Sequence, residues 1–429
     1  MNSDAKESPP RHNSPEEDGS LPGDLRMARA LWPVLLASVV SLLPFTVFST
    51  YLVPIADDAG SSVAAMGGLR GLGGLAALLV GTALAPLIDR VPRHTAAATG
   101  LGVLGASAAL GASGEFILLA GFCLLVGAGT SLLNPALTAA AADRFGTGKS
   151  AGRAATLVTA TQSMTAMLAA PLVALPAALW GWEGDLLAVT AVSVLLAVFL
   201  LVRGGKGQPD GPDADGGREQ RLGYLESFKA LAAVRGVTPL LGISLLRTAV
   251  FMGYLSYLAA YYDERFQLAP ATFAFVWTLS GASFFVSNLL TGRVTNSAGT
   301  RTATERLLIL GLVCALLSVA GFYFTYWLPL ALALTALHAA SHAVVAACVV
   351  SLLVRRCGTS LRGSALSINA AGMSFGVFAG ASLGGAGLGL AGYPGMASVF
   401  GVLTAVALGV AFLVARPGSP GGAVEHGAT

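Results

Sequence analysis

The chain has 429 residues, of which 55% are hydrophobic and 11% are charged. A soluble protein of this length carries about 25% charged residues, so the composition excludes an ordinary soluble protein. The mean hydropathy of +0.73 indicates a membrane protein, and the net charge of +3 gives no reason to expect a nucleic-acid partner.

Twelve apolar stretches follow one another along the chain. A transmembrane helix needs about 20 mostly apolar residues, because the hydrocarbon core of a bilayer is about 30 Å thick. The sequence therefore predicts an all-α membrane protein with twelve transmembrane helices. The predicted spans are residues 30–54, 63–87, 95–113, 116–140, 153–178, 186–202, 238–261, 270–291, 304–325, 328–353, 364–389 and 394–415.

Polar segments separate these spans into two groups. Residues 1–29 are rich in proline, serine and acidic residues, so we expect a disordered tail and not a signal peptide. The longest internal connection contains a flexible Gly/Pro/Asp run and then an amphipathic stretch around residues 224–233. The predicted units are the tail 1–29, the six-helix half 30–202, the central loop 203–237, the six-helix half 238–415 and the tail 416–429.

Charge alternates between the connections. Lys and Arg gather in the two tails and in every second connection, and only Arg70, Arg247 and Arg265 lie elsewhere. By the positive-inside rule, both tails and the central loop are cytoplasmic. The abundance of Ala, Gly and Arg is typical of a GC-rich bacterial genome, so we expect the plasma (inner) membrane of a bacterium. The opposite connections carry Asp57, Asp58, Glu115, Glu183, Asp185, Asp263 and Glu264.

Two of the basic connections, residues 85–94 and 292–301, carry related motifs. Both resemble the signature of the major facilitator superfamily between helices 2 and 3 and its weaker copy between helices 8 and 9. Together with the twelve spans and the central loop, the resemblance covers essentially the whole chain. The first copy retains Asp89, Arg90 and Arg93, and it departs from the family at Ala85, Pro92 and His94.

The resemblance implies two pseudo-symmetric six-helix halves and secondary transport by alternating access. It also implies that Asp89, Arg90 and Arg93 latch helices in one conformation and release them in another. The alternative is a solvated charge cluster that only sets the topology.

Some residues within the spans look like the twelve-span drug-efflux branch of the family. Asn134 precedes a proline in span 4, and Gly181 precedes a tryptophan after span 5. The helix 4 arginine of that branch is missing, and Ala170 stands where the helix 5 antiporter signature has glycine. The matches favour export.

Small residues recur at four-residue spacing in span 11, at Gly372, Gly376, Gly380 and Gly384. Small residues at this spacing let helix backbones approach closely. In the fold that the chain resembles, spans 2 and 11 pack across the two halves. We therefore expect Gly376 and Gly380 to form a smooth seam on which the halves rock, the alternative being close packing without motion.

Arg247 lies about ten residues into span 7, near the bilayer midplane. A charge at this depth is expensive and usually faces a cavity or a partner. Phe251 and Tyr254 follow on the same face, and the family resemblance implies that span 7 lines the central cavity. We expect Arg247, Phe251 and Tyr254 to contact substrate, the alternative for Arg247 being a structural hydrogen bond to backbone. Arg70 in span 2 is a candidate gating residue, or its side chain snorkels to the membrane surface.

His338 and His342 lie four residues apart in span 10 and so share one helix face. All 22 acidic residues fall in tails, connections or helix ends, which removes the commonest proton carrier from the midplane. An unperturbed imidazole titrates near pH 6.5, so the two histidines are the best candidates for proton coupling. The alternative is a neutral pair that hydrogen-bonds substrate or Ser341. With no third ligand, we expect no metal site.

Further candidates for substrate contact are Phe45 and Phe48 in span 1 and Asn134 in span 4, with Thr46, Ser49 and Gln162 near them. Asn and Gln in apolar helices are equally often interhelical glue. Ser382 lies in a G-x-S-x-G pattern like that of serine hydrolases. That motif needs a sharp, exposed elbow, whereas here it stands inside a glycine stripe.

The sequence as a whole predicts a secondary transporter of the major facilitator superfamily that exports a small amphipathic or anionic organic compound. We expect alternating access driven by protons, a lipid bilayer as surroundings, a monomer, and no cofactor or metal. An importer of an organic anion on the same fold is the alternative, and an intramembrane serine hydrolase is a distant one.

Overall fold

The computed structural model describes residues 24–88, 91–146, 149–204, 224–296 and 301–415. Helices make up nearly all of these ranges, and no strand occurs in them. Nine helical stretches in the described ranges are long and apolar enough to span a membrane. Two of them, Ser150–Arg203 and Leu361–Val414, are 54 residues long and could each cross twice. The predicted all-α membrane fold is therefore confirmed, while the number of twelve spans stays a prediction.

The helices follow one another along the described ranges. Their bounds are α1 Asp24–Val40, α2 Leu43–Thr50, α3 Leu52–Asp58, α4 Val63–Ile88, α5 Arg93–Gly111, α6 Phe116–Asp143, α7 Lys149–Gly204, α8 Tyr224–Ala233, α9 Val237–Phe266, α10 Pro270–Asn296, α11 Arg301–Phe322, α12 Leu328–Arg356 and α13 Thr359–Ala415.

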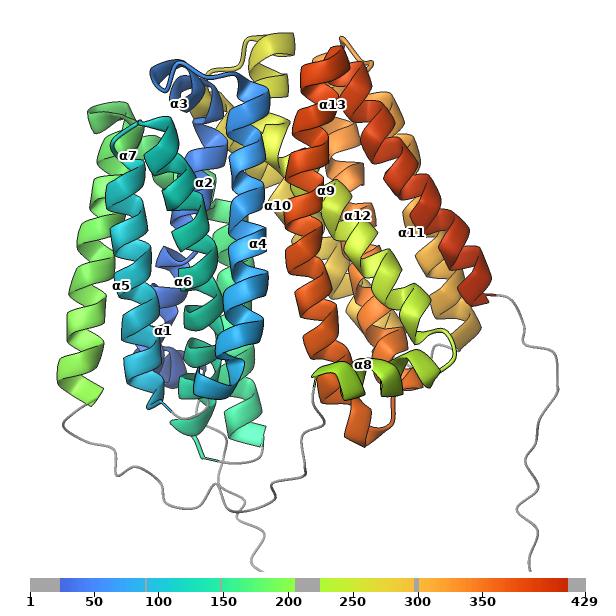
Figure 1. The fold of residues 1–429 in the computed structure, drawn as a ribbon, viewed down its shortest axis with the longest axis horizontal. Coiled ribbons are helices and arrows are strands. Elements are labelled where there is room, and N and C mark those ends of the chain that lie inside the picture. Colours follow the sequence, from blue (N-terminus) through green and yellow to red (C-terminus); the bar gives the residue numbers. More distant parts are fainter. Residues whose placement is uncertain (1–23, 89–90, 147–148, 205–223, 297–300, 416–429) are drawn as a thin grey trace, which may run out of the picture.

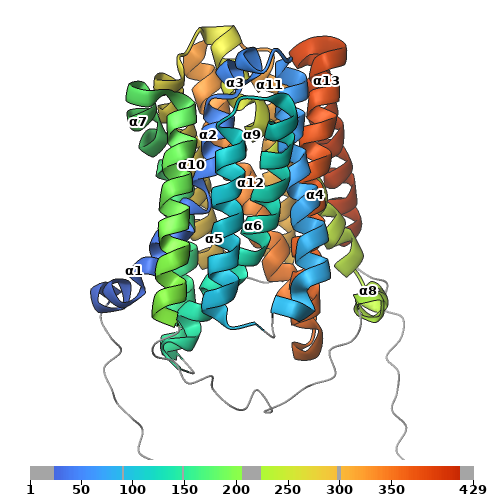
Figure 2. The same cartoon turned by 60° about the vertical axis from the view of Figure 1, so that its left-hand side comes forward.

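The first predicted span is not one helix but the three pieces α1, α2 and α3, which climb in sequence through the molecule (Figure 2). Pro44 and Pro54 lack the backbone N–H that would continue the helical hydrogen bonds across the breaks before them. The helix also begins at Asp24, inside the predicted tail, because Met27 is already buried against the other helices. The rest of the tail lies outside the described residues.

The two longest helices are each broken once. The backbone of α7 leaves helical geometry at Gly181, with φ 74°, and that of α13 does so at Ala391 and Gly392, with φ 63° at the glycine. A positive φ is easily adopted only by glycine, so each break is placed where the sequence permits it. Both breaks fall between predicted spans.

The helices form two bundles, one of α1 to α7 and the other of α9 to α13, with α8 lying across one end (Figure 1). The closest packing between the bundles is of α4 on α13 and of α7 on α10. The bundles converge at the end that carries α3 and diverge toward the end that carries α8 (Figure 1). We call these the α3 end and the α8 end.

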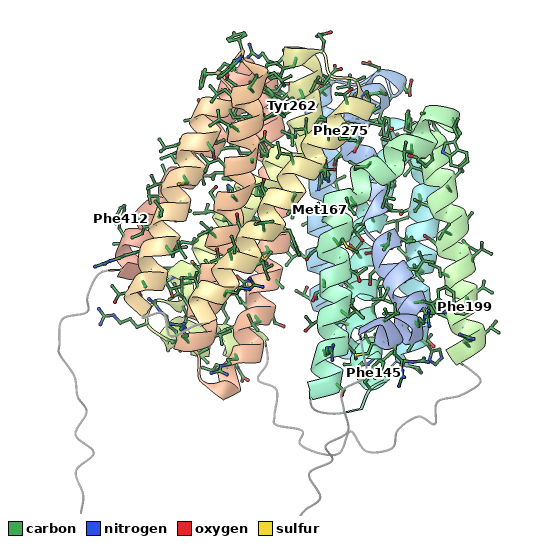
Figure 3. The ribbon with its side chains drawn as sticks, turned by 180° about the vertical axis from the view of Figure 1, so that it is seen from behind. Phe145, Met167, Phe199, Tyr262, Phe275 and Phe412 are labelled. Carbon is green, nitrogen blue, oxygen red and sulfur yellow. The ribbon has the colours of Figure 1, made fainter. Side chains whose placement is uncertain are left out.

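Backbones almost touch where the bundles meet. A Cβ atom added to Gly74 of α4 would lie 2.6 Å from the Ser374 carbonyl oxygen of α13. On the other side, a Cβ added to Gly281 of α10 would lie 2.7 Å from the Cα of Met167 in α7. Figure 3 labels Met167 at the place where the two bundles meet. We call these two contact lines the seam.

The glycine stripe of span 11 does not lie at the seam. Gly376 and Gly380 of α13 face α9 of the same bundle, where a Cβ on Gly376 would lie 2.7 Å from the Leu245 carbonyl oxygen. A Cβ on Gly380 would overlap the Ala249 carbonyl oxygen. The expected placement is thus corrected, because the opposite face of α13 meets α4. A role of these glycines in coupling stays a prediction.

Replacing Gly380 with alanine should destabilise the protein, because the added methyl group meets backbone that cannot yield. Overpacking of this kind costs about 1–3 kcal/mol. Gly372, on the same stripe, has no atom within 4 Å of an added Cβ, so Gly372→Ala is the matched control and should be neutral or slightly stabilising. Thermal unfolding of both variants in detergent measures the effect, and equal midpoints would contradict the packing.

Candidate functional site

Arg247 lies in the eleventh position of α9, and its side chain is only 3% exposed. Its guanidinium donates to the Thr248 hydroxyl at 3.0 Å and to the His342 carbonyl oxygen at 3.5 Å. Its Nε has no hydrogen-bond partner among the described residues. The side chain is therefore a buried cation, and both hydrogen-bond acceptors that it has among the described residues are neutral.

Two histidines lie beside it on α12. His338 and His342 are almost completely buried, and their ring centroids are 4.4 Å apart. The Phe251 ring stacks on His342 at 5.2 Å, and the Tyr254 ring lies 4.5 Å from that of His338. The structure thus brings five predicted site residues together. We call Arg247, Phe251, Tyr254, His338 and His342 the Arg247 cluster.

Hydrogen bonds define the tautomer of His338. Its Nδ1 lies 2.9 Å from the Ser318 hydroxyl of α11, and that hydroxyl donates its one hydrogen to the Ala315 carbonyl oxygen at 2.8 Å. Nδ1 of His338 must therefore be the donor to Ser318. Nε2 of His338 and both ring nitrogens of His342 have no partner in the described part of the chain.

A tyrosine pair closes the cluster toward the α3 end. The phenols of Tyr254 and Tyr262 both bond the Thr335 hydroxyl, at 2.8 and 2.9 Å. Thr335 and Ser318 were not predicted. Thr335 lies three residues before His338 on α12, which is a usable signal, whereas no histidine on α11 marks Ser318. All these residues lie on α9, α11 and α12, so the cluster sits within one bundle and not at the seam.

Arg70 is the buried cation of the other bundle. It is 9% exposed, donates to the Ser49 hydroxyl at 2.5 Å, and lies over the Phe45 ring at 5.6 Å. The alternative that it snorkels to the membrane surface is therefore wrong, because its guanidinium turns inward onto α2. Phe45 and Phe48 both pack against Phe122, and Phe48 is buried in the core.

Asn134 of α6 pairs with Gln162 of α7. The Gln162 amide donates to the Asn134 side-chain oxygen at 3.1 Å. Both side chains are half-buried and belong to the same bundle as Arg70. This bond links α6 to α7, which is the structural alternative that the sequence allowed for these two residues. Contact of either residue with substrate stays a prediction.

The basic connection after α4 is described only in part, because Asp89 and Arg90 lie outside the described residues. Arg93, at the start of α5, places its Nε 3.7 Å from a carboxylate oxygen of Asp143 at the end of α6. Both side chains are exposed, and exposed pairs contribute little to stability, about 0–1 kcal/mol. The predicted latch stays a prediction.

The structure also bears on the Ser382 motif and on groups of side chains that could hold a metal. No group of three or more His, Cys, Asp or Glu side chains that could hold a metal occurs in the described ranges. Ser382 lies in an unbroken part of α13 and packs toward Gly71 of α4, so it does not stand on an exposed elbow.

Comparison with known proteins identifies a family for this chain. Residues 34–328 match the family model of the Major Facilitator Superfamily. Among curated proteins, the chain is 27% identical over 324 residues to the transcription regulatory protein OpdE of Pseudomonas aeruginosa, covering 72% of this chain and 74% of OpdE.

Solved transporters share the fold. A bacterial homologue of the human lysosomal transporter Spinster, in an inward-facing and unoccupied conformation, aligns with a TM-score of 0.73 and 16% identity, covering 92% of this chain and 99% of that one. The nucleoside transporter NupG aligns with a TM-score of 0.71 and 14% identity, covering 90% and 98%.

Removing the shared hydroxyl by Thr335→Val should destabilise the protein, because two buried phenols lose their partner. Leaving a buried polar group unpaired costs about 1–3 kcal/mol. Thr404→Val is the matched control, since the buried Thr404 hydroxyl bonds only the Phe400 carbonyl oxygen of its own helix. Thermal unfolding in detergent should separate the two variants, and Thr335→Ser should restore the midpoint. Equal losses in both valine variants would show that the shared bond contributes nothing specific.

Proposed function

Since the chain belongs to the major facilitator superfamily, we propose that it is a secondary transporter that exports a small amphipathic or anionic organic compound by alternating access. The observation that carries the proposal is that the contact between the two bundles is close on one side of the molecule and open on the other. The bundles meet at backbone distance halfway along α4 and α10, at Gly74 and Gly281. They stay together toward the α3 end, where a Cβ on Gly385 would lie 2.7 Å from the Ala64 carbonyl oxygen, and they diverge toward the α8 end (Figure 1).

The core of the protein supports this motion. The larger apolar cluster continues across both bundles near the α3 end, from Phe122 and Val47 to Tyr257. The second cluster, near the α8 end, is formed by residues of the bundle of α9 to α13, which we call the C-terminal bundle, and by Leu231 of α8. Each bundle can therefore rock as a unit if the contacts at the α3 end separate, which is the interface rotation that switching proteins use.

Few polar bonds would break in such a motion. Among the described residues, the Trp277 indole donates to the Ala166 carbonyl oxygen at 3.1 Å, and the Tyr257 hydroxyl lies 3.3 Å from that of Ala64. The remaining seam is formed by small and apolar side chains. A contact of this kind has a low barrier to separation, because it leaves few unpaired polar groups.

The charges inside the bundles favour an anionic substrate. Arg70 and Arg247 are the cations that lie deep within the predicted spans, while every acidic residue lies in a tail, a connection or a helix end. Charged residues at such depth usually mark substrate or ion pathways. Arg70 and its neighbour Phe45 would supply charge and aromatic area to a bound organic anion.

The direction and coupling of transport complete the proposal. The distribution of basic residues favours a cytoplasmic α8 end in a bacterial membrane, and the divergence of the bundles would then open toward the cytoplasm. With no carboxylate at mid-depth, His338 and His342 are the proposed proton carriers. Gly376, Gly380 and the connection of Asp89, Arg90 and Arg93 are proposed to support the switch.

The relative OpdE suggests a second candidate function, because it is named as a transcription regulatory protein. A membrane regulator built on a transporter fold would bind its ligand without moving it across the membrane. Measurement of net flux distinguishes this function from transport.

The test is the accumulation of a panel of organic acids in an efflux-deficient bacterial host. We expect the wild type to lower accumulation of at least one compound, and Arg70→Gln or a protonophore to restore it. Arg265→Gln, at the α3 end of α9, is the matched control and should export normally. Higher accumulation with the wild type would identify an importer, and unchanged accumulation across the panel would favour the regulator.

A disulfide across the seam should stop transport. A Cβ on Gly71 of α4 would lie 3.3 Å from the Ala381 Cβ of α13, close to the roughly 3.5–4.5 Å of a disulfide. In a background with the four native cysteines replaced by alanine, oxidised Gly71→Cys/Ala381→Cys should lose export of the identified compound, and a reductant should restore it.

The matched control joins two helices of one bundle. A Cβ on Gly105 of α5 would lie 3.3 Å from the Ser193 Cβ of α7, so Gly105→Cys/Ser193→Cys can form the same bond without crossing the seam. This variant should transport equally well when oxidised and when reduced. Full transport by the oxidised seam variant would argue against rocking.

A further inference from the structure

We propose that the C-terminal bundle contains a site for a monovalent anion, held by the Arg247 guanidinium and the ring N–H of His342, with His338 packed beside them. The ligand is a small halide-like ion or the carboxylate end of a carried compound. A carboxylate of a carried compound as the ligand rests on the proposed function, whereas the site itself does not.

The first argument is charge. Arg247 is 3% exposed, and taking an ion out of water costs several kcal/mol unless another charge compensates it. The described acidic residues of this bundle lie at its two ends. Asp263 and Glu264 stand at the end of α9, and Glu305 at the start of α11 pairs with Arg356 at 2.8 Å. The described part of the chain therefore supplies Arg247 with no counter-charge.

The second argument is the set of unpaired nitrogens. More than about 90% of buried polar groups in proteins have a hydrogen-bond partner. Here the Nε of Arg247, the Nε2 of His338 and both ring nitrogens of His342 have none among the described residues. The Arg247 guanidinium donates to the His342 carbonyl oxygen, so the unpaired N–H groups of Arg247 and of the His342 ring lie in neighbouring side chains and point to one missing acceptor between them. Nε2 of His338 carries no proton, because the proton of that ring is on Nδ1, so it is not a donor to this acceptor.

The third argument separates an anion from water. A water molecule could accept from Arg247 and His342, but it would leave the guanidinium charge uncompensated in an apolar surrounding. A bound anion accepts the same hydrogen bonds and also neutralises the charge. Phe251 and Tyr254 form apolar walls on the histidines, which raises the strength of that attraction.

The fourth argument limits the charge of the ligand. Arg247 is the only permanent cation of the cluster, and Nδ1 of His338 is already engaged with Ser318. One cation balances a monovalent anion, whereas a sulfate or hydrogen phosphate dianion would remain partly uncompensated. Halides and simple carboxylates therefore fit the cluster, and dianions do not.

Thermal unfolding of the purified full-length protein in detergent tests the site. Sodium chloride, bromide or acetate would replace sodium HEPES, a bulky sulfonate, at constant ionic strength. A ligand that binds the native state alone raises the unfolding midpoint in a saturable way. We expect at least one of the three small anions to do so, and ³⁵Cl line broadening in the presence of the protein reports chloride binding directly.

Three variants make the test specific. Arg247→Met should abolish the rise in midpoint and the line broadening, and in HEPES it should unfold no earlier than the wild type, because it removes an uncompensated charge. His342→Phe should weaken anion binding, since it keeps the ring and removes both nitrogens. Arg265→Met, on the same helix and half-exposed, should retain the full response.

The outcomes are decisive without any transport assay. A response to halide that Arg247→Met abolishes would support a resident inorganic ion, and a response to acetate alone would support the carboxylate of a carried compound. No response to any of the three anions would overturn the proposal. An unchanged response in Arg247→Met would also overturn the proposal. A failure to detect export in cells would not change the interpretation of any of these binding results.

Discussion

The structure depends on one constraint, which is the cost of leaving a polar or charged group unpaired where water is absent. The backbone meets it by forming helices, in which each peptide bonds within its own segment. Side chains meet it in pairs, as Glu305 does with Arg356 and Gln162 with Asn134. Arg247 is a buried cation whose Nε has no partner in the described chain. The buried Thr50 and Ser193 hydroxyls also lack a partner there, but each is single and uncharged. At Arg247 a cation and the neighbouring His342 ring lack partners together, which marks the place where a component from outside belongs.

Close approach of backbones serves two different purposes in this fold. Within the C-terminal bundle, Gly380 lets α13 lie directly on α9, and the same device joins helices of the other bundle at Gly127 and Gly73. Between the bundles, Gly74 and Gly281 provide a similar contact that is somewhat less close. The first kind holds each bundle rigid, and the second lets the bundles meet without interlocking side chains. Rigid bundles and a smooth seam are both needed for alternating access.

Much of this could be predicted from the sequence because it depends on local pattern. Apolar length indicated membrane helices, and helical spacing placed Arg247, Phe251 and Tyr254 on one face and the two histidines on another. Which neighbour a face meets is a tertiary property. The glycine stripe was therefore assigned to the wrong helix, Arg70 was given an alternative at the membrane surface, and Ser318 and Thr335 were missed. A period of four residues identifies a contact surface, but it carries no information about the helix on the other side.

The two buried arginines occupy different positions with respect to the motion. Arg70 bonds α2, and α2 also contacts α9 and α10 of the other bundle, so a rocking motion changes the surroundings of Arg70. The Arg247 cluster lies among α9, α11 and α12, and rigid-body rotation preserves contacts within a bundle. A group bound near Arg70 would therefore be exposed alternately to the two sides. An anion beside Arg247 would move with its bundle and keep it neutral, which lowers the work of moving that bundle in the electric field of the membrane.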